Sequence, residues 1–288
     1  MRRHRDGWYI ETPGEPECAF DPADHDPGRR AELVRSDGLD LACVALSSPL
    51  GIEALPSGEA EPLLDAWHEG AAAFPPKLRA WAAPCLAAPD ADELGALLDR
   101  GFVGICLPAE ALSRPEGVDR YAPILDLLGE RDAPLLVHPG PGPHTLRTAG
   151  ANGSQAGGET PGPSWWPALT RYVAAMNAAW HAFAAYGPVH PRLRVCFAML
   201  AGLAPLHRER LIRRGGPGAA MPEVFLDTSS YGPRAIDAII RELGVDSLVY
   251  GSDRPVIGPA PPDLGDAVRV AMLSRNPARL LGLAEVPA

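Results

Sequence analysis

The chain has 288 residues, 46% hydrophobic and 22% charged, so it can bury a large core and lacks the composition of a disordered protein. Its formal net charge of −10 argues against a nucleic-acid partner, because nucleic-acid binding depends on clustered lysine and arginine. No apolar run approaches the roughly 18 residues of a membrane span, and the N-terminus has no apolar signal region. The five cysteines are widely spaced without a CxxC pair, which favours a reducing compartment. We expect a soluble, cytoplasmic protein with no membrane partner.

Residues 1–39 form a polar, proline-rich N-terminal segment, in which the sequence predicts at most a hairpin between residues 7 and 20. From residue 40 to 288 we expect one domain that repeats an apolar strand, a turn and an alanine- and leucine-rich helix. The strands are continuous apolar runs, typical of parallel strands covered on both faces. They are predicted at 40–46, 78–83, 102–107, 134–138, 193–198, 223–227 and 247–250. The helices are predicted near 59–74, 91–100, 119–131, 166–186, 203–214, 233–243 and 264–273.

This alternation predicts an α/β fold with a parallel sheet, either open or closed. The chain length suits a closed (β/α)8 TIM barrel, which requires eight strands where the pattern supplies seven. A missing strand would have to precede residue 40, so we expect a TIM barrel possibly lacking its first strand. A glycine- and proline-rich loop over 139–164 follows the fourth predicted strand and has the length of a lid or binding loop.

Two reactive side chains stand where predicted strands end. His138 closes the strand 134–138, and Asp253 follows the strand 247–250. Because active sites of parallel α/β folds lie at the carboxyl ends of the strands, these two groups could share a metal ion or act as a base and its orienting partner. The alternative for each is a structural role, satisfying loop backbone groups or capping the next helix.

Three further residues are candidates for substrate binding. Asp227 ends the strand 223–227, Arg254 could bind a substrate carboxylate or merely pair with Asp253, and Trp165 could wall a pocket together with Trp166. Sequences of the types GxGxxG, GxxxxGK and GxSxG are absent, so nucleotide-cofactor, phosphate-loop and serine-hydrolase chemistry lack their usual anchors.

Several motifs together resemble the amidohydrolase-related family that includes aminocarboxymuconate semialdehyde decarboxylase. They are VHPG at 137–140, HPRLRV at 190–195, EVFLDTS at 223–229, YGSDRP at 250–255 and NPARLLGL at 276–283. The resemblance implies a TIM barrel that in most members holds one divalent metal ion, zinc or manganese. Its ligands there are an HxH pair on strand one, a His ending strand five and an Asp ending strand eight, and a strand-six His commonly assists. His138 matches the strand-five ligand and Asp253 the strand-eight carboxylate.

Two elements of the family pattern are missing. Met199 stands where the strand-six His would be, and a thioether cannot transfer a proton. The HxH pair is absent, since His4 and Asp6 imitate its spacing only in a charged stretch. Either the protein begins upstream of Met1 or this branch works without a metal, and we expect the first. The single lysine, Lys77, precedes the strand 78–83, which argues against relatives that use a carboxylated lysine.

The leading functional hypothesis is an amidohydrolase-type hydrolase of a small carboxylated or cyclic substrate. In it, a water activated by the metal or by Asp253 attacks a carbonyl carbon, and His138 acts as a ligand or an electrophile. A nonoxidative decarboxylase on the same scaffold and an inactive barrel retained for binding are the alternatives. The sequence leaves open the substrate, the metal and whether the chain forms a homo-oligomer.

Overall fold

Seven parallel strands organise the computed structural model, which describes residues 2–4, 7–10, 17–143, 165–187, 192–216, 223–258 and 263–283. Each overlaps a predicted strand; six lie within the predicted bounds, and the strand predicted at 102–107 ends one residue later, at Pro108. They are β4 (Ala42–Val44), β5 (Leu78–Ala80), β6 (Ile105–Pro108), β7 (Leu135–His138), β8 (Val195–Phe197), β9 (Val224–Asp227) and β10 (Leu248–Val249). Strands β6 to β10 pair with their neighbours in chain order, β4 pairs with β5, and a bridge from Ala82 to Ile105 joins the two groups. Most of the predicted loop 139–164 lies outside the described residues.

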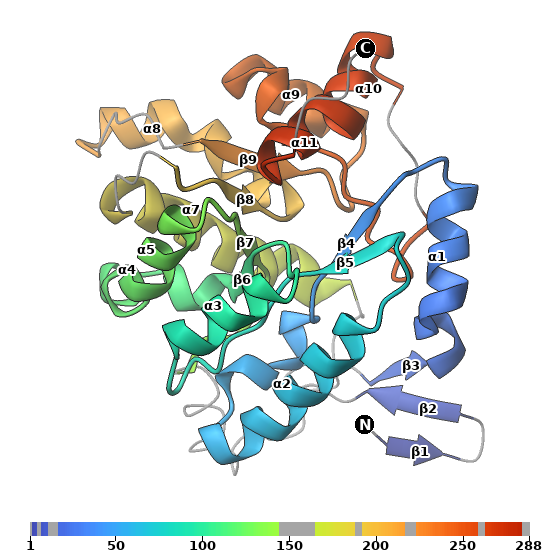
Figure 1. Cartoon of the computed structure of the whole chain (residues 1–288). Coiled ribbons are helices and arrows are strands. Elements are labelled where there is room, and N and C mark those ends of the chain that lie inside the picture. The colour runs from blue at the N-terminus through green and yellow to red at the C-terminus, as the bar shows by residue number, and fades with distance from the viewer. Residues whose placement is uncertain are drawn as a thin grey trace.

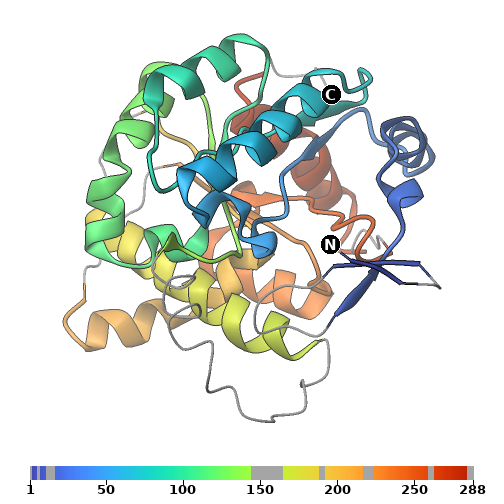
Figure 2. The ribbon, with the colours of Figure 1, turned by 90° about the horizontal axis from the view of Figure 1, so that it is seen from below.

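Helices surround these strands in chain order, as the colour progression around the molecule shows (Figures 1 and 2). The α-helices are α1 (Pro27–Ser36), α2 (Ser57–Ala72), α3 (Ala91–Asp99), α4 (Pro115–Arg120), α5 (Ala122–Glu130), α7 (Val173–Tyr186), α8 (Arg208–Arg213), α9 (Pro233–Leu243), α10 (Asp266–Val270) and α11 (Asn276–Leu280). A π-helical segment, Ala168–Tyr172, precedes α7. The fold is the predicted TIM-barrel type, with seven barrel strands among the described residues. None of the described helices is long and apolar enough to cross a membrane.

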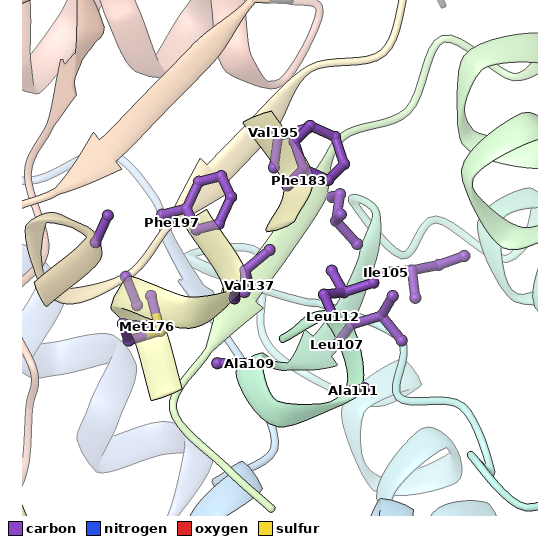
Figure 3. Packing of buried hydrophobic residues seen from close by; sticks show 14 of the residues in the cluster. Ile105, Leu107, Ala109, Ala111, Leu112, Val137, Met176, Phe183, Val195 and Phe197 are labelled. Carbon is purple, nitrogen blue, oxygen red and sulfur yellow. The ribbon is translucent and has the colours of Figure 1, made fainter. Parts of the chain in front are cut away.

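Side chains alternate between two apolar layers along each strand, which explains why the strands read as continuous apolar runs. The inner layer fills the barrel with Trp81, Cys106, Leu136, Cys196, Phe225 and Val249, and Leu280 of α11 packs against it. The outer layer packs the strands against the helices. In Figure 3, Val137, Val195 and Phe197 of β7 and β8 face Phe183 and Met176 of α7.

The N-terminal segment contains more structure than the sequence predicts. Strands β1 (Arg2–His4), β2 (Gly7–Ile10) and β3 (Cys18–Phe20) form a small antiparallel sheet, so His4 lies outside the barrel. Helix α1, which we did not predict, follows it. Asp26 caps this helix by accepting a hydrogen bond from the Arg29 N–H at 2.8 Å, and Pro27 occupies its first turn. An Asp-Pro start of this kind is a recognised helix signal.

Strands β4 and β10 are the two edges of the described sheet, and no described strand pairs with their outer sides. Arg254, which follows β10, donates two hydrogen bonds to Asp37, which precedes β4, at 2.9 and 2.8 Å. Arg30 of α1 also donates to the Arg254 carbonyl at 2.8 Å. We call this link between the two edges the α1 clamp. It holds the segment after β10, and with it Asp253, against the N-terminal helix.

Candidate functional site

His138, Asp227 and Asp253 converge at one rim of the barrel. His138 and Asp227 lie two residues beyond Leu136 and Phe225 of the inner layer, so strand alternation turns them toward the barrel interior at its carboxyl end. Asp253 follows β10 at the same end. Its charge acts on both other groups: it partly opposes the burial that lowers the pKa of His138, and it adds to the burial that raises the pKa of Asp227. The structure therefore brings these three predicted residues together, although their roles stay predictions.

His138 is oriented by its own loop. The Nδ1 atom lies 3.0 Å from the Pro139 carbonyl oxygen. Because a carbonyl oxygen only accepts, this contact requires the proton on Nδ1 and leaves a lone pair on Nε2. Burial lowers the pKa of His138, opposed by the Pro139 hydrogen bond and by Asp253. The imidazole is thus neutral near pH 7, with a basic nitrogen free to face the rim.

Asp227 is a buried carboxyl with three hydrogen-bond donors. Its Oδ1 accepts from the backbone N–H groups of Met199 and Ser229, each at 3.0 Å, and its Oδ2 accepts from the Ser229 hydroxyl at 3.0 Å. Burial nevertheless raises its pKa from 3.8 to about 6, and the Asp253 charge adds to this rise. A carboxyl with this pKa exchanges a proton near neutral pH, which suits general acid–base chemistry.

Asp253 has a left-handed backbone conformation, with φ of 51°. A non-glycine residue in this region carries strain, and such residues concentrate at functional sites. The Ser230 hydroxyl donates to Asp253 Oδ2 at 2.7 Å. Ser230 directly follows the DTS motif, in the polar run after the strand 223–227 that the sequence offers for orienting a substrate. Oδ1 of Asp253 accepts none of the hydrogen bonds found in the described part of the chain, so it is available to a substrate or a water.

Gly251 makes room for this arrangement. A Cβ atom at this position would lie 2.3 Å from Ser229 Oγ and 2.6 Å from Asp227 Oδ2. Only glycine allows the chain after β10 to pass so close to Asp227. The glycine of the YGSD sequence is therefore a packing requirement of the site.

Met199 opens a left-handed turn at the end of β8. Residues Met199 to Leu203 all have φ between 47° and 63°. Each non-glycine residue in this conformation costs about 1 kcal/mol. The turn is held by Asp227, which accepts the Met199 N–H, and by the Asn177 side chain, which donates to the Gly202 carbonyl at 2.7 Å. The site therefore uses the backbone of Met199, while its thioether supplies no proton donor.

Arg254 and Trp165, the other two residues predicted to bind substrate, have contacts elsewhere. The guanidinium of Arg254 pairs with Asp37 rather than with Asp253, so its Nε and Nη2 are already engaged. Trp165 is 53% exposed and packs edge-on against Trp166, with ring centres 5.5 Å apart. None of the described contacts joins Trp165 to the three rim residues. Substrate binding by Arg254, Trp165 and Asp227 stays a prediction.

A metal ion would find two ligands here, Nε2 of His138 and the carboxylate of Asp253. A catalytic zinc normally takes three protein ligands and a water. Within the described ranges, no three His, Cys, Asp or Glu side chains are grouped so that they could hold a metal. Asp227 is a poor third ligand, because three of the four acceptor positions of its carboxyl are taken by hydrogen bonds and its raised pKa leaves it partly protonated near neutral pH. The described residues therefore do not fit a complete metal shell, and we derive no reaction step through a metal.

Comparison with known proteins bears on this geometry. A family model described as amidohydrolase matches residues 57–283, which is most of the chain. The chain belongs to the amidohydrolase family. The suspected resemblance is thereby confirmed. A search of the curated proteins gave no match.

Solved structures similar to this family member include several decarboxylases. Against 2,6-dihydroxybenzoate decarboxylase from Rhizobium the TM-score is 0.64 at 20% identity, covering 88% of this chain and 87% of that one. Against 5-carboxyvanillate decarboxylase from Novosphingobium aromaticivorans, solved with bound manganese, the TM-score is 0.68 at 20% identity, covering 90% and 82%. Against a putative amidohydrolase from Staphylococcus aureus it is 0.67 at 18% identity, covering 89% and 91%. At these identities the likeness shows the shared fold.

Proposed function

We propose that this amidohydrolase-family chain is a nonoxidative decarboxylase of small cyclic carboxylic acids, hydroxylated aromatic acids among them. The observation that carries the proposal is Asp227, a rim carboxyl whose pKa is raised to about 6. Nonoxidative decarboxylation requires a proton donor at the carbon that loses the carboxylate, and a carboxyl with this pKa is partly protonated near neutral pH. The decarboxylases of similar fold support the choice of reaction and substrate class.

In the proposed reaction, the O–H bond of Asp227 breaks and its proton bonds to the ring carbon that carries the carboxylate. The bond between that carbon and the carboxylate then breaks, its electron pair returns to the ring and carbon dioxide leaves. Asp227 regains a proton from solvent. Neutral His138 accepts a hydrogen bond from a substrate hydroxyl through Nε2, which orients the ring. A divalent ion, zinc or manganese, held by His138 and Asp253 stays a separate prediction.

Hydrolysis is the second candidate, and one observation favours it. Asp253 Oδ1 accepts no hydrogen bond among the described residues and lies near His138, as a general base for an attacking water would. In this reaction the water loses a proton to Asp253 as its oxygen bonds to a carbonyl carbon and the carbonyl π pair moves to the carbonyl oxygen. The carbonyl then re-forms, the bond from its carbon to the leaving group breaks, and the leaving group takes the proton from Asp253. A barrel that binds without reacting is the third possibility.

Isotope incorporation distinguishes the decarboxylase, the hydrolase and the barrel that binds without reacting. The purified protein would be incubated with hydroxybenzoates and with lactones, in D2O and separately in H2¹⁸O. A decarboxylase releases carbon dioxide and places deuterium on the ring carbon, whereas a hydrolase places ¹⁸O in the product. Binding of a hydroxybenzoate with neither incorporation would favour the inactive barrel and would refute both enzymatic proposals.

Amino-acid substitutions test whether Asp227 is the general acid of the proposed decarboxylation. Asp227→Asn is expected to lower decarboxylation at least a hundredfold, the usual contribution of a general acid being about 10² to 10⁴. Asp126→Asn on the exposed side of α5 is the matched control and should leave the rate unchanged. The wild-type rate should fall as pH rises through about 6, because Asp227 must be protonated. A rate that increases over this range would contradict the role of Asp227 as the acid.

A further inference from the structure

A second polar cluster joins the segment after β4 to β6, and the proposed reaction does not use it. Ser48 and Glu53 follow β4, and Cys106 belongs to β6. All three side chains are fully buried. The Ser48 hydroxyl donates to Glu53 Oε1 at 2.6 Å and lies 4.0 Å from the Cys106 sulfur. A buried carboxyl in apolar surroundings is unusual and calls for a reason.

Burial raises the pKa of the nearby Cys106 thiol. It also raises the pKa of Glu53, against the opposing hydrogen bonds from Ser48 and from the backbone N–H of Glu53 itself. Its Oε2 is buried without a partner in the described residues. The short hydrogen bond at Oε1 fixes the Ser48 hydroxyl.

Ser48 in turn contacts the loop that orients His138. Gly140 approaches Ser48 so closely that a Cβ on Gly140 would lie 2.5 Å from Ser48 Cβ and 2.9 Å from the Ser48 carbonyl. The peptide between Pro139 and Gly140 carries the carbonyl oxygen that accepts the His138 Nδ1–H. On its other side, the Gly140 carbonyl accepts the Glu110 N–H at 3.3 Å. The peptide is therefore held between Ser48 and the end of β6.

We propose that Glu53 and Ser48 are positioning residues that set the tautomer of His138 through the Pro139–Gly140 peptide. Held by Glu53, Ser48 supports the Gly140 backbone, and the Pro139 carbonyl stays aimed at Nδ1. The proton then stays on Nδ1 and the lone pair on Nε2. This inference rests on the proposed function for its catalytic meaning, because there His138 orients substrate through Nε2. The tautomer itself can be measured without any substrate.

The test is ¹⁵N NMR of histidine-labelled protein at pH 8, with the His138 signals identified by comparison with His138→Gln. Wild-type protein should show His138 predominantly with the proton on Nδ1. Ser48→Ala and Glu53→Ala should lower the ratio of the two tautomers roughly fivefold, which corresponds to losing one hydrogen bond of about 1 kcal/mol. Glu53→Gln should retain the wild-type ratio, because its amide oxygen can accept the hydrogen bond from the Ser48 hydroxyl that Oε1 of Glu53 accepts.

Gly140→Ala is an independent test of the same proposal. Its new methyl group would displace the loop that orients His138 without altering Ser48 or Glu53. Gly58→Ala, at a helical glycine with open space around it, is the control for the substitution itself. The proposal is overturned if folded Ser48→Ala or Gly140→Ala keeps the wild-type tautomer ratio. If the ratio shifts as expected while no substrate reacts with the wild type, the positioning role holds and the decarboxylase proposal fails.

Discussion

Replacing Asp227 by asparagine should stabilise the protein at neutral pH while it removes activity. The pKa of Asp227 is about 6 in the native state against 3.8 for the free side chain. At about 1.4 kcal/mol per pKa unit, ionisation of this buried group costs the native state roughly 3 kcal/mol above pH 6. Asparagine has the same shape, its oxygen can accept from Met199 and Ser229, and its amide can donate to the Ser229 hydroxyl. It avoids the cost of burying a charge.

The difference in free energy of unfolding between Asp227→Asn and the wild type should depend on pH. Below about pH 4 the carboxyl is protonated in both native and unfolded states, so it contributes no difference in stability. Between about pH 4 and pH 6 the native state binds more protons than the unfolded state, so the free energy of unfolding of the wild type falls as pH rises. The advantage of Asp227→Asn should therefore grow from near zero to about 3 kcal/mol over this interval.

Urea unfolding followed by circular dichroism, from about pH 4 to pH 8, measures this difference directly. Asp126→Asn, an exposed change on α5, should stay within about 0.5 kcal/mol of wild type at every pH. An Asp227→Asn protein that is less stable than wild type at pH 8, or whose advantage does not depend on pH, would show that the native carboxyl is not destabilised by burial.

Three further changes test the packing that supports the site. Arg194→Met should lower the free energy of unfolding by about 1–3 kcal/mol in urea titrations, because the buried guanidinium donates to the Leu280 carbonyl at 2.9 Å and to the solvent-exposed Asp132; a loss under about 0.5 kcal/mol would mean that these contacts add little. Phe197→Ala should cost about 3–5 kcal/mol by the same measurement, since it leaves a cavity between β8 and α7, and an unchanged midpoint would contradict the described core. Gly251→Ala should lower activity at least tenfold in the isotope assay, because its methyl group would collide with Asp227 and Ser229, whereas Gly232→Ala, with open space around it, should be silent.

The barrel could be predicted because its strands are apolar on both faces. Runs such as LLVH at 135–138 and VFLD at 224–227 carry inner-layer and outer-layer side chains alternately, and each ends in a polar residue at the rim. Strand alternation then fixes where His138 and Asp227 point. That part of the site follows from local pattern and general α/β topology.

Other features depend on contacts between distant segments and leave little trace in the sequence. The pairing of Arg254 with Asp37 joins residues far apart in the chain, and the adjacent Asp253 looked an equally good partner. The left-handed turn at Met199–Leu203 contains a single glycine, so propensity gives no warning of it. Glu53 was missed although a lone acid between Ile52 and Ala54 is a usable signal of a buried carboxyl.

The α1 clamp has a consequence for how the molecule behaves in concentrated solution. Closed barrels leave no strand edge open to another chain, but in the described part of this one the outer sides of β4 and β10 are unpaired, and side chains span the space between them. Asp37→Asn, which removes the negative charge that Arg254 pairs with, would loosen that span and expose two rows of backbone donors and acceptors. This variant should therefore self-associate through strand addition more readily than the wild type, which size-exclusion chromatography at several concentrations would detect.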